Sequence, residues 1–160
     1  MLNTQTQIET GNSVNFSGNY IKLEIDGEMF GLDIQAMNGV VGDREMTPIP
    51  NAPSYVKGVC NLMGERLPVV DMRLMLNREV NENDRAHVII AREMSRGQYM
   101  KVGLMVDKVT QVESTQPEFF SAAPSYGTDE SSEYVAGTIP GAEASISLLN
   151  VESILSRVNI

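Results

Sequence analysis

Residues 55–71, YVKGVCNLMGERLPVVD, contain two apolar, β-prone runs on either side of the dipeptide Met63-Gly64. β-Branched residues favour strands, and a glycine between two such runs favours a tight turn, so we predict a β-hairpin here. A methionine at the tip of a hairpin is hard to bury against its own strands. Met63 is therefore a candidate for a surface that contacts a partner.

A second copy of this pattern lies 79 residues further along the chain. Tyr55–Gly58 is matched by Tyr134–Gly137, and residues 67–71 are matched without a gap by residues 146–150. Residues 31–40 resemble residues 103–112 in the same way. We interpret the chain as two sequential copies, each with about five short strands, which is enough for one small closed barrel. Because such a barrel has little internal space, function is expected on the outer faces and in the groove between the barrels.

The remaining segments fit an all-β chain with one terminal helix. Residues 20–25 alternate between apolar and polar, and Asp26-Gly27 is a dipeptide typical of a type I′ hairpin turn. Further strands are predicted within residues 28–41, 87–91, 99–106 and 106–114 and a hairpin within 138–150, whereas residues 47–53 and 121–133 are predicted loops. Residues 1–18 are predicted to be a flexible tail, with order beginning at Tyr20. Asn150 is a predicted helix cap, followed by an apolar stripe at Val151, Ile154, Leu155 and Val158.

The composition disfavours several classes of function. The net charge of −9 argues against binding to nucleic acid or anionic membranes. The single cysteine, Cys60, lies among apolar residues and is interpreted as a small core side chain, and the single histidine, His87, as structural or surface-exposed. No catalytic group, metal site or cofactor is predicted. A β-barrel that binds a small ligand is a remote alternative. Without a signal pattern or an apolar run of membrane length, the expected location is cytoplasmic.

Several ordered motifs resemble the CheW family, the adaptor of bacterial chemotaxis. GVCNLMG at residues 58–64, followed by PVVDM at 68–72, is similar to the family's core pattern, and VGLMVDKV at 102–109 is similar to a second family segment. Residues 30–34, 49–53 and 148–150 also fit, so the resemblance covers about residues 20 to 160. It implies two SH3-like barrels that face each other, with short connecting helices. The implied boundaries are a tail at 1–18, a first barrel at about 19–83, a second at about 85–150 and a C-terminal helix at 151–159.

The resemblance also implies a non-enzymatic role. Such adaptors couple the cytoplasmic tip of a methyl-accepting chemoreceptor to the regulatory domain of the histidine kinase CheA, in receptor arrays at the inner face of the membrane and without inserting into it. Carried over by position, the predicted receptor-binding residues are Met37, Gly39, Val40, Gly58, Leu62, Met63 and Gly64. The predicted kinase-binding residues are Val41, Met46 and Ile49. An adaptor of a non-chemotaxis kinase, serving pilus or surface motility, would carry the same motifs and is an alternative.

Gly39 and Met63 depart from the family pattern. The family usually has arginine at the position of Met63 and often glutamate at that of Gly39, and the two charges can pair across the groove. Loss of one alone would leave an unpaired charge in a partly buried place, whereas loss of both avoids that cost. We therefore interpret the double replacement as altered partner choice, with neutral drift as the alternative.

Overall fold

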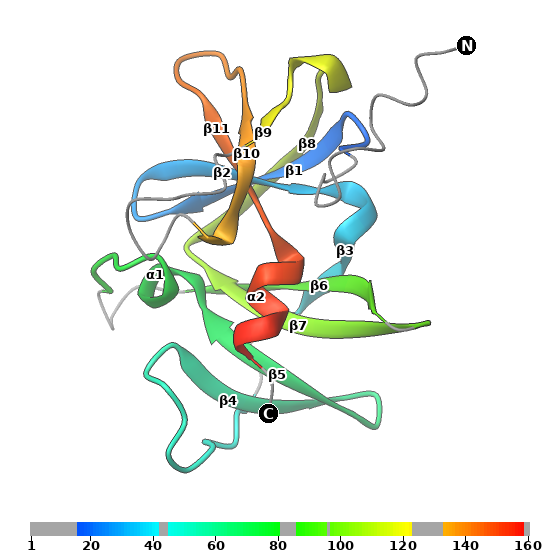
Figure 1. Ribbon diagram of the computed structural model, residues 1–160. Coiled ribbons are helices and arrows are strands. Elements are labelled where there is room, and N and C mark those ends of the chain that lie inside the picture. Colours follow the sequence, from blue (N-terminus) through cyan, green and yellow to red (C-terminus); the bar gives the residue numbers. More distant parts are fainter. Residues whose placement is uncertain (1–15, 42–44, 81–85, 96, 123–132, 159–160) are drawn as a thin grey trace.

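The computed structural model describes residues 16–41, 45–80, 86–95, 97–122 and 133–158 (Figure 1). Strands make up most of the described chain, which confirms a mostly β fold. In chain order the elements are β1 (Asn19–Ile25), β2 (Glu28–Asp33), the 3-10 turn η2 (Ile34–Ala36), β3 (Met37–Val41), β4 (Val56–Leu62), β5 (Glu65–Asp71), α1 (Met72–Met75), β6 (His87–Ser95), β7 (Gln98–Val106), β8 (Lys108–Ser114), η3 (Pro117–Phe119), β9 (Ser121–Ala122), β10 (Val135–Ile139), β11 (Ile146–Leu149) and α2 (Val151–Arg157).

The strands form two sheets, with the orders β8-β1-β2-β11-β10-β9 and β3-β6-β7-β5-β4. We call these the upper sheet and the lower sheet, as they appear in Figure 1. Neighbouring strands are antiparallel except for β2 with β11 and β5 with β7, which run parallel. Parallel neighbours need a long connection, so these two pairs join segments that are distant in sequence.

Each sheet contains strands from both copies of the repeat, unlike the sequential division predicted near residue 84. The upper sheet combines β1 and β2 with β8 to β11, and the lower sheet combines β3 to β5 with β6 and β7. The exchange occurs because η2 leads the chain out of β2 and across to β3, which pairs with β6 in the lower sheet. The sequential interpretation assumed that strands close in sequence stay in one sheet.

The internal repeat itself is confirmed by equivalent hydrogen bonds in the two copies. The amide of Asp71 donates to the carbonyl of Tyr55 at 2.7 Å, and the amide of Asn150 donates to the carbonyl of Tyr134 at 2.8 Å. Both residues also start a helix, because Asp71 caps α1 and Asn150 caps α2. The offset of 79 found in the sequence is thus a structural equivalence.

Two equivalent glycines allow the parallel strands to approach each other. Gly31 lies opposite Leu148, and Gly103 lies opposite Val69. An added Cβ at Gly31 would lie 2.8 Å from a methyl carbon of Leu148, and one at Gly103 would lie 3.1 Å from a methyl carbon of Val69. A Cβ would thus force a neighbour aside at Gly31 and crowd its neighbours at Gly103, so glycine favours close packing at the same place in each sheet.

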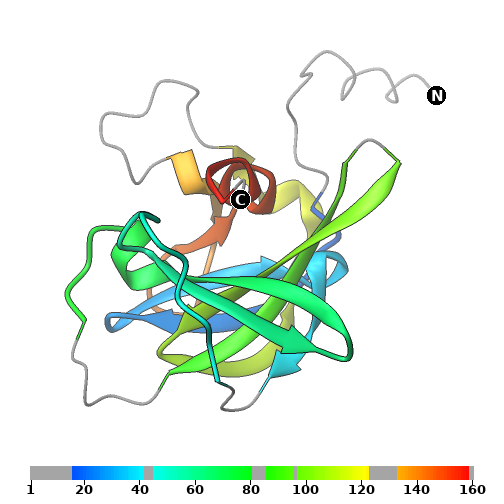
Figure 2. The ribbon, with the colours of Figure 1, turned by 90° about the horizontal axis from the view of Figure 1, so that it is seen from below.

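The largest hydrophobic core lies between the sheets. Successive residues such as Tyr20 and Ile21 belong to different clusters because side chains alternate across a strand. The central cluster includes Leu23 and Leu32 of the upper sheet, Ile89, Val102 and Leu104 of the lower sheet and Ile154 of α2. Each sheet also has a smaller cluster on its other face. Figure 2 shows α2 packed across one end of this arrangement, with the β6–β7 hairpin extending past the other strands.

Both predicted hairpin turns are present, the type I′ turn at Asp26-Gly27 and the turn at Met63-Gly64. Asp26 and Gly27 have φ values of 51° and 78°, and Met63 and Gly64 have φ values of 52° and 87°. Positive φ at both central residues gives the turn the twist of the flanking strands. The helix prediction also holds, since Asn150 Oδ1 accepts a hydrogen bond from the Ser153 amide at 3.1 Å and the predicted stripe packs inward. The helix ends at Arg157 rather than at residue 159, which lies outside the described residues.

Residues 16–18 pack on the upper sheet, although the sequence predicted a tail at residues 1–18 and order only from Tyr20. The ring of Phe16 is buried, with its centroid 6.3 Å from that of Tyr20 and 6.0 Å from that of Phe120. Ser17 Oγ donates to Asp33 Oδ1 at 2.7 Å. Burial of one aromatic ring holds this segment on the upper sheet. Residues 1–15 of the predicted tail lie outside the described residues.

A short strand occupies part of the loop predicted at residues 121–133. Ser121 and Ala122 form β9, which pairs with β10 opposite Thr138 and Gly137. Residues 123–132 of that predicted loop lie outside the described residues. An added Cβ at Gly137 would lie 2.2 Å from the carbonyl oxygen of Ser121, so the glycine leaves the room that β9 needs to pair with β10.

Candidate interaction surfaces

The β4–β5 hairpin presents Met63 to solvent. Its side chain is 94% exposed, the most of any large apolar side chain in the described residues. The turn is held by Asn61 Oδ1, which accepts a hydrogen bond from the Gly64 amide at 3.1 Å. The sequence prediction of an exposed apolar tip is therefore confirmed. A rigid turn with an exposed methionine is suited to contact a partner, because methionine adapts to irregular apolar surfaces.

Strand β3 turns different side chains to different surroundings. Met37 packs against the central core, whereas Val40 is 51% exposed and Val41 only 7% exposed. The pairing of β3 with β6 shifts register between Met37 and Gly39, and Gly39 has φ of 133°. Because a bulge interrupts the alternation of side chains, the motif alone does not tell which face each residue takes.

The smaller cluster of the lower sheet brings together residues that the resemblance assigned to two different partners. Val41 is a member of this cluster, and Leu62 and Met46 pack against it. Leu62 was predicted to bind the receptor, and the other two were predicted to bind the kinase. Since Val41 is buried, a partner would contact it only through its neighbours.

The segment before β4 lies along the edge of the lower sheet. Thr47 and Val59 exchange two backbone hydrogen bonds, each of 2.9 Å. Gly58 is buried beneath this segment, and an added Cβ there would lie 2.5 Å from the carbonyl oxygen of Thr47. Gly58 therefore has a backbone role. Met46 and Ile49 in the same segment are half-buried and accessible to a partner.

A buried ion cluster fixes the end of β5 against the turn between β7 and β8. Arg73 Nε and Nη2 donate to the two carboxylate oxygens of Asp71 at 2.9 and 3.0 Å, and Nη1 donates to Asp107 Oδ1 at 2.9 Å. The hydrogen bonds to Asp71 are the main cause of a raised pKa of the Arg73 guanidinium. Asp107 Oδ2 also accepts from the Asp26 amide. The cluster is structural, since it links α1, β1–β2 and the β7–β8 turn.

Exposed apolar residues outside the predicted set lie in other elements. Met94, Tyr99 and Met100 are about half exposed near the tip of β6–β7, and Val112 and Phe119 are 54% exposed at the upper sheet. Met94, Tyr99 and Met100 were not among the predicted site residues. The signal that could have found them is the length of their hairpin, because β6 and β7 each have 9 residues whereas the equivalent β1 and β2 have 7 and 6. A longer second hairpin projects its end beyond the core.

The described part of the chain has neither a membrane-spanning helix nor a metal-binding cluster. No helix in it is long and apolar enough to span a membrane. The described residues also contain no group of three His, Cys, Asp or Glu side chains placed to hold a metal ion. Cys60 is a free thiol, 3% exposed, as expected for a core residue.

The whole of this two-sheet region corresponds to one known domain. Residues 19–159 match the family model described as the CheW-like domain. The chain belongs to the CheW-like domain family. This confirms the resemblance stated from the motifs, and it makes the chain a member of a family of chemotaxis scaffold proteins.

Relatives and a solved structure agree with this assignment. "Chemotaxis protein CheW" of Klebsiella aerogenes is 30% identical, over 86% of this chain and 81% of its own length. "Protein FrzA" of Myxococcus xanthus is 29% identical, over 69% of this chain and 68% of its own length. The crystal structure of the scaffolding protein TtCheW from Thermoanaerobacter tengcongensis aligns with a TM-score of 0.71 and 27% identity, covering 83% of this chain and 88% of that one.

Proposed function

We propose that this CheW-like protein is a non-enzymatic adaptor that couples the cytoplasmic tip of a chemoreceptor to the regulatory domain of a CheA-type histidine kinase. In this proposal the chain is cytoplasmic, is recruited to receptor arrays at the inner face of the membrane and forms two SH3-like barrels. Family membership supports the proposal. The single observation that carries it is Met63, an apolar side chain 94% exposed on a hydrogen-bonded turn inside the family's core motif.

The kinase would bind the segment that contains Met46 and Ile49. Both side chains are half-buried, and Thr47 between them is fixed to β4 by two backbone hydrogen bonds. A partly exposed apolar pair on a fixed backbone loses little conformational freedom on binding. Val41 would support this surface from beneath rather than contact the kinase, because its side chain is buried.

The receptor would bind the surface formed by the β4–β5 tip and the exposed part of β3. Val40, Met63 and Gly64 are the most accessible of the predicted residues, whereas Met37, Gly39 and Leu62 are half-buried and Gly58 is buried. A Cβ at Gly39 would have only the Ile90 side chain within 4 Å, at 4.0 Å, but φ of 133° disfavours any other residue. Glycine therefore suits the local backbone here, and the absence of both usual charges leaves an apolar surface that we propose selects a particular receptor.

Calorimetric titration with the regulatory domain of the CheA-type kinase from the same organism tests the kinase surface. We expect one-to-one binding that weakens only mildly with salt, because the surface is apolar. Ile49→Glu should abolish it, whereas Met63→Glu should leave it unchanged. Substitution of Val41 is unsuitable because a charge there would disrupt the core. Binding that is insensitive to Ile49→Glu would exclude this surface.

A pull-down with the cytoplasmic fragment of a receptor from the same organism tests the other surface. Met63→Glu should remove receptor binding and leave the melting temperature unchanged, because the side chain contacts solvent. Phe119→Glu is the matched control, since it places the same charge on an exposed apolar position of the upper sheet. Equal loss in both variants would indicate a general effect of charge rather than a receptor surface.

An adaptor of a different kinase system is the second candidate. It is favoured by one observation, the similarity to "Protein FrzA", a relative that is not named CheW. The same titration, repeated with the regulatory domain of each such kinase in the organism, distinguishes the two. The kinase that binds most tightly and responds to Ile49→Glu would identify the pathway.

A further inference from the structure

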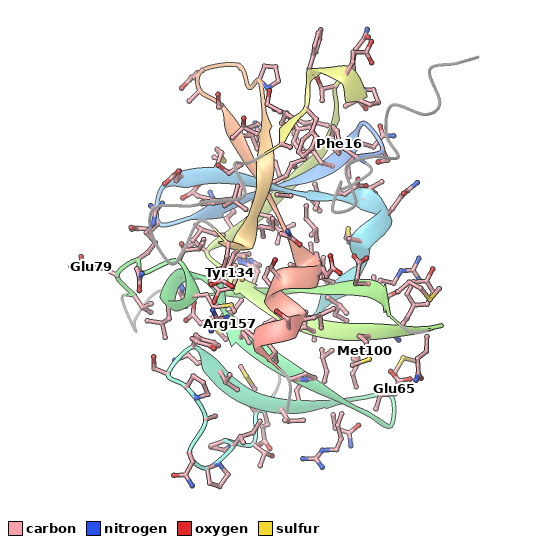
Figure 3. The ribbon with its side chains drawn as sticks, in the orientation of Figure 1. Phe16, Glu65, Glu79, Met100, Tyr134 and Arg157 are labelled. Atoms are coloured by element: carbon pink, nitrogen blue, oxygen red, sulfur yellow. The ribbon has the colours of Figure 1, made fainter. Side chains whose placement is uncertain are left out.

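A hollow of about 650 Å³ opens where β5 and β7 separate. These strands are paired from Val69 with Gly103 to Asp71 with Met105, and Pro68, which lacks an amide donor, precedes the paired part of β5. Earlier residues of β5 and β7 line opposite sides of the hollow, and Leu155 and Val158 contribute from the region of α2. Figure 3 shows Glu65 and Met100 at this side of the molecule, near the ends of β5 and β7.

The hollow is positively charged in an otherwise acidic chain. Its lining includes Arg66, Arg92 and Lys101 against a single carboxylate, that of Glu65, whereas the whole chain has a net charge of −9. Lys101 Nζ is 3.3 Å from Glu65 Oε1, so that pair is neutral. The two arginines form no ion pair within the described residues and leave an excess of positive charge.

Arg92 has unused capacity to bind an acceptor. Its guanidinium carbon lies 4.4 Å from the centroid of the Tyr99 ring, a stacking contact that limits the orientations of the side chain. Arg92 Nε is buried and has no hydrogen-bond partner among the described residues. A buried donor without an acceptor is unfavourable, and the guanidinium as a whole has no carboxylate partner among the described residues. A carboxylate that pairs with this guanidinium would add charge-assisted hydrogen bonds.

Apolar side chains surround the charged ones. Tyr99 and Met100 line the hollow and are about half exposed, and Met94 is about half exposed near the tip of the same hairpin. Aromatic residues, methionine and arginine are the types enriched at protein interfaces. The combination is therefore typical of a surface that recognises a polypeptide.

We propose that this hollow binds a segment of a partner protein in which acidic side chains alternate with apolar ones. A carboxylate of the segment pairs with Arg92, a second reaches Arg66, and the apolar side chains pack on Tyr99, Met100 and Leu155. The occupant is a different protein rather than a second copy, because two copies of charge −9 repel each other. The hollow borders the proposed receptor surface, because its lining includes Asn38 of β3 and Glu65, which follows Gly64. Arg66, Arg92 and Tyr99 belong to neither the receptor surface nor the kinase surface, and the inference does not rest on the proposed function.

Fluorescence anisotropy with the full chain tests this proposal. The probe is a fluorescein-labelled peptide of alternating glutamate and leucine or phenylalanine, and its control replaces every glutamate by glutamine. We expect the acidic peptide to bind and the control to bind at least about tenfold more weakly, as expected for the loss of a charge-assisted pair. Amide chemical shifts should change at residues 66, 92, 99–101 and 155.

Variants locate the binding on the hollow. Arg92→Gln and Arg66→Gln should each weaken the acidic peptide by several-fold, and Arg66 is exposed, so its replacement does not endanger the fold. Arg78→Gln is the control, since it removes the same charge from a half-exposed pair with Glu28. Equal binding of both peptides, equal effects of all three variants or shifts confined to other residues would overturn the proposal. Self-association in sedimentation equilibrium that the two arginine variants abolish would overturn it in favour of a second copy.

Discussion

Asp71 and Asn150 occupy the same position in the two copies of the repeat, but only Asp71 is charged. Each donates its amide to an equivalent tyrosine carbonyl, and each caps the helix that follows through a side-chain oxygen. The caps need an acceptor, which either residue supplies. The charge of Asp71, which is 0% exposed, is balanced by Arg73, and Arg73 also reaches Asp107. One copy thus has a plain cap, and the other has a cap that ties two distant segments together.

The largest expected effect follows from removing the cation of this cluster. Arg73→Met leaves Asp71 and Asp107 without their partner, one of them fully buried, and should lower the free energy of unfolding by about 3–5 kcal/mol. Urea denaturation at neutral pH measures the change. Arg78→Met, which breaks a half-exposed pair with Glu28, is the matched control and should cost about 1 kcal/mol or less.

A loss below about 1 kcal/mol for Arg73→Met would contradict the buried-pair interpretation. It would mean that the two aspartates find other partners or take up protons when the guanidinium is removed. Asp71 and Asn150 would then differ in charge without a corresponding difference in their contribution to the free energy of unfolding.

Exchanging the two caps tests the same difference with smaller changes. Asp71→Asn keeps a cap but removes the charge that pairs with Arg73, so we expect a loss of about 2 kcal/mol, the range for a hydrogen bond to a charged group. Asn150→Asp should change stability by less than about 0.5 kcal/mol, since asparagine and aspartate cap helices about equally. Chemical denaturation of both variants provides the comparison. Equal losses would show that the cap itself, rather than the charge, sets the cost.

Local patterns were sufficient to predict the parts of the fold that depend on neighbours in sequence. The turns at Asp26-Gly27 and Met63-Gly64, the cap at Asn150 and the apolar stripe of α2 each depend on a few adjacent residues. The exchange of strands between the sheets could not be predicted this way. It depends on where η2 directs β3, which pairs with β6 rather than with a strand close to it in sequence.

The candidate site was predictable in position but not in orientation. The motif located Met63, and the turn type explains why its side chain is exposed. The motif did not indicate that Val41 faces inward, because the register shift at Gly39 reverses the alternation of β3. The arginines of the hollow were missed because Arg66 and Arg92 are distant in sequence and line the same hollow only through the pairing of β5 with β7 and of β7 with β6.

The smallest predicted effect concerns the hairpins β1–β2 and β6–β7. Ile21 pairs with Leu32 and Ile25 with Glu28, and in the second copy Ile89 pairs with Leu104 and Glu93 with Met100. Glu93 therefore stands where the first copy has the buried Ile25. Partial burial, together with the nearby charge of Glu152, raises the pKa of the Glu93 carboxyl.

The sign of the pH dependence follows from this raised pKa. The folded state binds the Glu93 proton more tightly than the unfolded state, so the stabilisation is complete below the ordinary glutamate pKa of about 4.3. It is lost as the pH rises through the higher pKa of the folded state. Glu93→Gln removes this loss, so its melting temperature should exceed that of the wild type at pH 7 by more than it does near pH 4. Glu118→Gln, which removes an exposed carboxylate from η3, controls for net charge. A difference between Glu93→Gln and the wild type that is the same at both pH values would show that Glu93 does not oppose folding when ionised, and that the end of the longer hairpin is as well solvated as an exposed loop.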